Sequence, residues 1–156
     1  SEAFVSKKIM GKKTDEIVMP GGHLTVAQLT AMLNTIPLEI TFVDEDNINR
    51  FFNEGPKDFK RPGMAIDREV FSCHPPKVEQ QVRHIIGEFR KGTLDKVPIW
   101  MEKNGKTMLV TYMAVRDAAG TYLGTMELVQ DMGFAKEHFL SDVKAKEAAL
   151  RAGMED

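Results

Sequence analysis

Several features that fix the structure or location of small proteins are scarce or absent in this chain. Cys73 is the single cysteine among 156 residues, which excludes an internal disulfide and indicates a reducing compartment. No apolar run approaches the roughly 20 residues that a membrane-spanning helix needs. No basic segment followed by an apolar one resembles a signal peptide. We therefore expect a cytoplasmic protein that makes no contact with a membrane.

The chain also lacks an excess of charge of one sign. The formal net charge is -2, and Lys and Arg are dispersed rather than clustered on one segment. A nucleic-acid-binding protein normally carries a basic surface that contacts phosphates, so we expect no nucleic acid as a partner. The length suits one domain with a real core, and ten methionines suit a core that adapts its shape.

The motifs of common enzymes and metal sites are missing. The sequence contains no G-x-G-x-x-G, no P-loop and no G-x-S-x-G motif. One cysteine and four scattered histidines cannot form a structural zinc site. The acidic run at 44–46 is similar to a calcium loop, but Asn49 and Gly55 stand where such a loop needs Gly and Glu. We therefore expect no enzyme, no structural zinc site and no calcium loop.

Hydrophobic periodicity and turn residues divide the chain into helices and strands. We expect a loop or short edge segment over 17–24, a helix over 26–36, a hairpin of strands 38–43 and 48–52, a helix over 76–92, strands over 97–103, 106–116 and 122–131, and a helical tail over 134–152. Thr25 is the expected N-cap of the first helix. Gly92 is the expected stop of the longer helix, and Asn104-Gly105 predicts a two-residue hairpin turn.

The expected strand over 106–116 is apolar on both faces. Alternation places two sets of side chains on opposite sides: Leu109, Met113 and Val115 on one, and Met108, Val110, Tyr112 and Ala114 on the other. The amphipathic helix over 76–92 covers only one face of an antiparallel sheet. We therefore expect a second cover, supplied by the terminal helices, by a partner subunit, or by both.

This order of elements resembles the PAS fold over residues 25–131. Three strings are similar to one bacterial group in particular: ITFVDEDNINRFFNEGPK at 40–57, FSCHPPK at 71–77 and VRDAAGTYLGTMELVQD at 115–131. That group is the PAS domain found at the C-terminal end of proteins with a DUF438 region, often beside a hemerythrin-like region. The resemblance implies an α+β fold with a five-stranded antiparallel sheet, helices on one face, flanking N- and C-terminal helices, a helix-walled pocket and a homodimer.

The resemblance also suggests a division of the chain. We expect a flexible N-terminal segment over 1–24, the PAS domain over 25–131 and a C-terminal helix over 132–156. PAS domains commonly end in an Asp-Ile-Thr-like junction to the output helix. This chain has Asp131-Met132-Gly133 instead, and Gly133 is expected to make that junction looser.

The string Cys73-His74-Pro75-Pro76 has two interpretations. Thiolate and imidazole both bind haem iron, so His74 or Cys73 is a candidate haem ligand. In the alternative, Ser72 or His74 caps the N–H groups of the following helix. His84 lies on the polar side of that helix and is expected to face water.

A ligand pocket is expected between the longer helix and the sheet beneath it. The candidate lining residues are Val82, Ile86, Phe89, Trp100, Met101, Tyr112, Met113 and Met126. Tyr112 and Asn53 are the polar groups expected to orient a ligand. The alternative is an ordinary filled core built from the same side chains.

Three functions follow, in decreasing order of support. The first is a sensory domain that binds a small molecule or cofactor and relays its presence through the flanking helices or a dimer. The second is a dimerisation or interaction domain with a filled core, and the tail residues Phe139, Val143, Leu150 and Met154 offer an apolar stripe for it. The third, a small isomerase, requires paired ionisable groups in the pocket, and the apolar stripes show none.

Overall fold

The structure, a computed structural model, describes residues 15–55 and 66–155, with the side chains of Ser72, Cys73 and Glu155 left aside. The chain divides into two compact units. The smaller unit consists of Ser1–Pro37 with Asn53–Gly55, and the larger consists of the remainder. Each unit is described separately below.

In the described part of the smaller unit, a hairpin leads into a helix. Strand β1 (Glu16–Met19) pairs antiparallel with β2 (Gly22–Thr25), where the sequence indicated a loop or a short edge segment. Helix α2 (Val26–Thr35) begins with a capping box: Thr25 Oγ1 accepts from Gln28 N at 3.0 Å, and Thr25 N donates to Gln28 Oε1 at 2.9 Å. The predicted N-cap at Thr25 is therefore confirmed.

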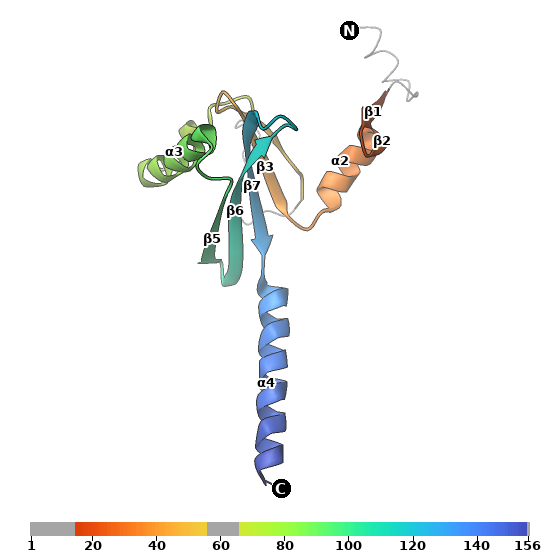
Figure 1. The fold of residues 1–156 in the computed structure, drawn as a ribbon, viewed down its shortest axis with the longest axis vertical. Coiled ribbons are helices and arrows are strands. Elements are labelled where there is room, and N and C mark those ends of the chain that lie inside the picture. The colour runs from red at the N-terminus through yellow and green to blue at the C-terminus, as the bar shows by residue number, and fades with distance from the viewer. Residues whose placement is uncertain (1–14, 56–65, 156) are drawn as a thin grey trace. The chain divides into compact units, whose positions relative to one another are not determined.

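The larger unit is built on a five-stranded antiparallel sheet in the order β4-β3-β7-β6-β5 (Figure 1). Its strands are β3 (Glu39–Asp44), β4 (Asn49–Phe52), β5 (Lys96–Lys103), β6 (Lys106–Arg116) and β7 (Tyr122–Asp131). The hairpin turn predicted at Asn104-Gly105 is present, and both residues have positive φ, 53° and 75°. The predicted α+β class and five-stranded antiparallel sheet are confirmed.

Short and long helical segments connect the two halves of the sheet. A 3₁₀ turn, η3 (Val70–Cys73), precedes α3 (Pro76–Lys91). Pro76 occupies the first turn of α3, where its missing N–H is no loss, and Gly92 ends the helix in the left-handed region at φ 77°. Both signals were read correctly from the sequence.

Helix α3 contacts β6 and β7 of the sheet. Its buried residues are Val82, Ile85, Ile86 and Phe89. His84 is exposed, as its helical position predicted, whereas Val78 at the first turn is exposed against expectation. The apolar stripe therefore meets the sheet only from the second turn onward.

Hydrogen bonds from two arginines connect the C-terminal half of α3 to the sheet and to the β3–β4 turn. Arg116 on β6 donates through Nη2 to the carbonyl oxygen of Phe89 at 2.7 Å, and its Nε pairs with Asp95 at 3.0 Å. Arg90 reaches the turn between β3 and β4, where it donates to the Glu45 carbonyl oxygen. The Arg116 bond satisfies a carbonyl group at the end of α3, and the Arg90 bond holds the helix to the β3–β4 turn.

One glycine allows β3 and β7 to approach each other closely. Gly124 on β7 pairs with Asp44 on β3 and has a φ of 157°. A Cβ atom at this position would lie 2.2 Å from the Val43 carbonyl oxygen and 2.7 Å from the Phe42 ring. Because backbone atoms cannot move aside as a flexible side chain can, only glycine fits here.

Helix α4 (Gly133–Glu155) follows β7 after a single residue. Met132 N donates to the Thr107 carbonyl oxygen at 2.8 Å, and Lys136 Nζ reaches Thr107 Oγ1 at 3.2 Å, so the first turn is held on β6. The side chains of the predicted apolar stripe are all exposed: Phe139, Val143, Leu150 and Met154. Within one chain, this stripe does not cover the sheet.

Candidate functional site

The register of the strands defines a helix-facing side of the sheet, on which cross-strand neighbours share one face. One row runs through Thr41, Glu127, Tyr112 and Val97, and the adjacent row runs through Glu39, Val129, Val110 and Ile99. This face meets α3, because α3 contacts β6 and β7 and Tyr112 packs against the cluster to which the α3 residues Val82 and Ile86 belong.

Two apolar clusters lie on this helix-facing side. One cluster lies under α3 and η3 and contains Val43, Val70, Phe71, Val82 and Ile86. The other lies on the sheet and contains Met108, Val110 and Val129, with Ile99 and Met101 packed against it. Tyr112 packs against both clusters and therefore joins them.

Two polar side chains among these apolar groups have no hydrogen-bond partner. Glu39 is 7% exposed and Thr41 is 6% exposed. The two carboxyl oxygens of Glu39 form no hydrogen bond within the described residues, and the hydroxyl group of Thr41 forms none either. Leaving one buried polar group without a partner costs about 1 to 3 kcal/mol, and native proteins rarely tolerate it without a reason. The pair is the strongest chemical feature of this face.

Further polar groups extend this feature across the neighbouring strands. Glu127 on β7 is the cross-strand neighbour of both Thr41 and Tyr112, and it is half-buried. Glu127 and Tyr112 take part in other interactions within the chain. The helix-facing side therefore combines carboxyl, hydroxyl and phenol groups with a surrounding apolar surface.

The predicted lining residues divide between the two faces of the sheet. Val82, Ile86 and Phe89 of α3 are buried, and Met101 and Tyr112 lie on the helix-facing side. Three others lie on the opposite face, where Trp100 is the neighbour of Leu109, and Met113 pairs with Met126. Trp100 is 61% exposed. Val82, Ile86, Met101 and Tyr112 therefore belong to the two clusters or pack against them, Phe89 is buried on α3, and the last three residues lie on the opposite face of the sheet.

The imidazole of His74 bonds to a backbone group that precedes it in the sequence and does not cap α3. Its Nδ1 lies 2.8 Å from the Val70 carbonyl oxygen, and since a carbonyl only accepts, Nδ1 is the donor. The N-cap residue of α3 is Pro75, and no side-chain hydrogen bond caps the helix there. The prediction that His74 caps α3 is therefore wrong. The side chain of Cys73 lies outside the described residues. Nε2 is the His74 nitrogen that remains for another bond.

Asn53 belongs to the smaller unit and holds the end of α2. It is 2% exposed, and its Nδ2 donates to the Leu33 carbonyl oxygen at 2.8 Å. The next residue, Glu54, donates its backbone N–H to Asn34 Oδ1 at 2.9 Å. Asn53 therefore satisfies a carbonyl at a helix C-terminus.

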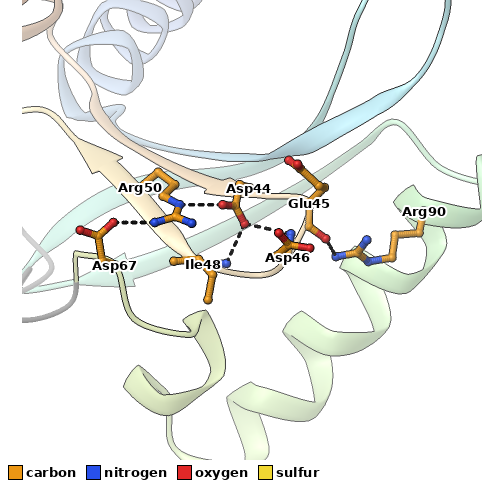
Figure 2. Close-up of polar contacts among 7 residues, drawn as sticks. All are labelled: Asp44, Glu45, Asp46, Ile48, Arg50, Asp67 and Arg90. Carbon is orange, nitrogen blue, oxygen red and sulfur yellow. Dashed lines mark hydrogen bonds and ion pairs between the residues drawn. The ribbon is translucent and has the colours of Figure 1, made fainter. Parts of the chain in front are cut away.

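The acidic run at 44–46 forms the turn between β3 and β4 (Figure 2). Asp44 Oδ1 accepts from the backbone N–H groups of Asp46 at 2.9 Å and Ile48 at 3.0 Å. Its Oδ2 accepts from Arg50 Nε at 2.6 Å, and Arg50 Nη1 continues to Asp67 Oδ1 at 2.7 Å. The run serves as a braced turn, and the described residues contain no cluster of three or more metal-ligating side chains.

The same bonds set the protonation of Asp44. Burial acts to raise the pKa of its carboxyl group. The hydrogen bonds from Arg50, Ile48 and Asp46 outweigh burial and hold the pKa below its ordinary value. The charge of Asp44 is therefore part of the folded turn.

The junction between β7 and α4 is braced rather than loose. Asp131 Oδ1 accepts from the backbone N–H of Gly133 at 2.8 Å, and Asp131 Oδ2 lies 3.9 Å from Lys106 Nζ. A Cβ at position 133 would lie 3.1 Å from that same Asp131 Oδ1, so glycine leaves room for the bond. The expected looseness at Gly133 is offset by these contacts.

Sequence reasoning missed the buried polar groups. It found no ionisable groups among the apolar stripes, yet Glu39 and Glu127 both lie on the helix-facing side. The available signal was alternation: Glu39, Thr41 and Val43 share one face of β3, and Thr125, Glu127 and Val129 share one face of β7. Which face points to the helix depends on long-range register, and β3 lies far from β7 in the sequence.

No helix in the described part of the chain is both long and apolar enough to cross a membrane. Comparison with curated proteins gives no match to this sequence. A family model for the PAS domain matches residues 29–133.

Several solved structures are similar to this chain. The C-terminal domain of a Streptococcus mutans protein is 39% identical with a TM-score of 0.76, covering 81% of this chain and 98% of that one. Vibrio cholerae VqmA, in a complex with ligand and DNA, is 19% identical with a TM-score of 0.52, covering 78% and 58%. A PAS domain from Colwellia psychrerythraea is 15% identical with a TM-score of 0.49, covering 69% and 97%. This chain belongs to the PAS domain family.

Proposed function

We propose that this chain is a sensory domain that binds a small molecule on the helix-facing side of its sheet. PAS domains are commonly sensory modules of signalling proteins and are typically not enzymes. The observation that carries the proposal is the pair Glu39 and Thr41, whose buried polar atoms have no partner within the described residues. A ligand that donates hydrogen bonds to them would remove this cost.

The relay is proposed to run through elements that contact the same face. Tyr112 packs on α3 and also on the sheet cluster, so a ligand beside it would alter the packing of both. The end of β7 continues through the braced Asp131–Gly133 junction into α4. A ligand shifts such an equilibrium only by its difference in affinity for the two packings.

Native mass spectrometry of the full chain tests this function. The protein is incubated with the low-molecular-weight fraction of a bacterial extract, and its mass is recorded without denaturation. We expect a discrete small-molecule adduct on the wild-type chain and a weaker one or none on Glu39→Met. A wild-type spectrum that shows only the bare chain would contradict the proposal.

Dimerisation without a ligand is the second candidate, and helix α4 supports it. Phe139, Leu150 and Met154 are exposed along this helix, and they would be buried if two copies paired. We propose a homodimer formed in this way, compatible with ligand binding. The same spectrum reports the number of subunits. A monomer at every concentration would contradict the dimer, and a dimer with no adduct would favour this candidate over the sensor.

Three finer proposals accompany the function. The strings at 40–57, 71–77 and 115–131 support membership in the DUF438-associated group, and the single Cys73 supports a cytoplasmic location. Haem is the less favoured ligand, although the bond from His74 Nδ1 to the Val70 carbonyl leaves Nε2 for an iron atom. An absorption scan of the purified protein decides this point: a haem band that disappears in His74→Ala would establish haem as the cofactor.

A further inference from the structure

The two acidic residues on the helix-facing side lie on neighbouring strands. Glu39 on β3 pairs with Val129 of β7, and Glu127 lies two residues before Val129 on the same face. Glu39 and Glu127 are therefore diagonal neighbours, for which the typical Cα separation is about 7 to 8 Å. Thr41, which pairs directly with Glu127, lies beside both. Three oxygen-bearing side chains thus converge on one patch of the sheet.

No positive charge from the described residues is placed to pair with Glu39. Its two oxygens form neither a hydrogen bond nor an ion pair there. Arg116, which is also on the helix-facing side, is held by Asp95 and the Phe89 carbonyl at the end of α3. A carboxyl group removed from water is stable in its charged form only when a cation or several donors face it.

We infer that the ligand is a small organic cation rich in N–H donors, such as an ammonium, amidinium or guanidinium compound, whose charged group binds Glu39. This inference rests on the proposed sensory function and deepens it. The ligand's N–H groups would donate to both Glu39 oxygens and to the Thr41 hydroxyl, the three buried atoms of this patch that have no partner.

The surrounding residues define the rest of the ligand. The row that contains Glu39 continues through Val129 and Val110 to Ile99, and Met101 packs against the same cluster. These side chains favour an apolar or aromatic body attached to the cationic group, and methionine adapts to its shape. Tyr112, in the adjacent row, adds an aromatic face that attracts a cation.

A simple metal ion fits this patch less well. Ca²⁺ and Mg²⁺ require six or more oxygen ligands in most sites. The described residues contain no group of three or more His, Cys, Asp and Glu side chains that could hold a metal ion. The apolar cluster beside Glu39 would also leave a hydrated ion in contact with hydrocarbon. An organic cation satisfies the carboxyl group and the apolar surface together.

A series of probes matched in shape and different in charge tests the inference. Benzylamine and benzamidine are the cations, benzyl alcohol and benzamide the neutral controls, and benzoate the anion. Each is titrated into the full chain, and backbone amide shifts in β3, β6 and β7 are followed by NMR. We expect the cations to bind at least about tenfold more tightly than the matched neutral probes, and benzoate not to shift these strands.

Two variants locate the binding group. Glu39→Gln keeps the shape and removes the charge, and it should weaken cation binding by about tenfold to a hundredfold, the range expected for hydrogen bonds to a charged group. Asp46→Asn, an exposed acid in the β3–β4 turn, is the matched control and should change nothing. The amide spectrum of each variant checks that it is folded. Equal cation binding by Glu39→Gln and wild type would overturn the inference.

The possible outcomes distinguish a failure of the cationic-ligand inference from a failure of the proposed sensory function. Neutral or anionic probes that bind these strands as well as the cations do would refute the cationic class and leave the sensory function standing. An adduct in the native spectrum whose composition is anionic would do the same. If no probe shifts β3, β6 or β7 and the native spectrum contains no adduct, both proposals fail.

Discussion

The two ends of β3 each carry an acidic side chain, and the two carboxyl groups have opposite surroundings. Asp44 at the C-terminal end accepts hydrogen bonds from Arg50 and from two backbone N–H groups. Glu39 at the N-terminal end is more deeply buried and accepts none from the described residues. The same strand therefore holds one satisfied acid and one unsatisfied acid.

This difference separates a structural residue from a candidate functional one. The bonds of Asp44 close a turn next to it in sequence, so they stabilise the hairpin without help from outside the chain. The described neighbours of Glu39 on this face, among them Val129, Thr41 and Glu127, donate no hydrogen bond to its carboxyl group. Such a residue is understandable when a binding partner supplies the missing donors.

The largest effect is expected at the satisfied end of β3. Asp44→Ala removes three hydrogen bonds, one of them from a charged Arg50, and should lower the free energy of unfolding by about 2 kcal/mol. Urea denaturation measures this change. The control is Asp46→Ala, an exposed neighbour whose loss should cost less than about 0.5 kcal/mol. Equal effects of the two substitutions would mean that the Asp44 bonds do not stabilise the turn.

A change of the opposite sign is expected at the unsatisfied end. Glu39→Met removes buried polar oxygens and keeps a side chain of similar length, so it should raise the free energy of unfolding by roughly 1 to 2 kcal/mol. The protein is first unfolded and refolded to remove any bound small molecule, and then denatured with urea.

The same urea denaturation is applied to Thr41→Val. The substitution preserves shape and removes the second unpartnered group, so it should stabilise in the same direction by a smaller amount. A clear loss of stability in Glu39→Met would show that the carboxyl group has a structural role in the ligand-free chain.

The smallest effect is a pH dependence of the Asp44 contribution. Hydrogen bonds hold the pKa of Asp44 below its ordinary value of 3.8. A lowered pKa contributes stability that is complete above the ordinary value and is lost as pH falls through the folded value. The stability difference between wild type and Asp44→Asn should therefore stay constant at higher pH and narrow in acid. A difference that widens in acid would contradict this assignment.

Local signals predicted most of the fold because each depends on neighbours in sequence. The Asn104-Gly105 turn fixes the β5–β6 hairpin, because both residues tolerate positive φ. Pro76 and Gly92 fix the ends of α3, and Thr25 with Gln28 fixes the start of α2. The β1–β2 hairpin was predicted only as a loop or short edge segment, because Met19 to Gly22 lies in a segment rich in turn residues.

The candidate site was predicted only in part, for a reason of register. Val82 and Ile86 were found from the stripe of one helix. Met113 and Met126 were assigned to the same pocket as Tyr112, yet they pair with each other on the opposite face. A displacement of one residue along a strand moves a side chain from one face to the other. Apolar residues on both faces of β6 give no local sign of which face meets the helix.

The sequence by itself determined the elements, their order and their ends, because capping, turn chemistry and periodicity act over a few residues. Only the tertiary structure decided that Glu39 and Thr41 lie beneath the helical side of the sheet while Trp100 lies behind it. This placement depends on the pairing of β3 with β7, which are separated by more than half of the chain, and on the packing of α3 against one face of the sheet. Such long-range contacts follow from the free energy of the whole fold rather than from any single segment.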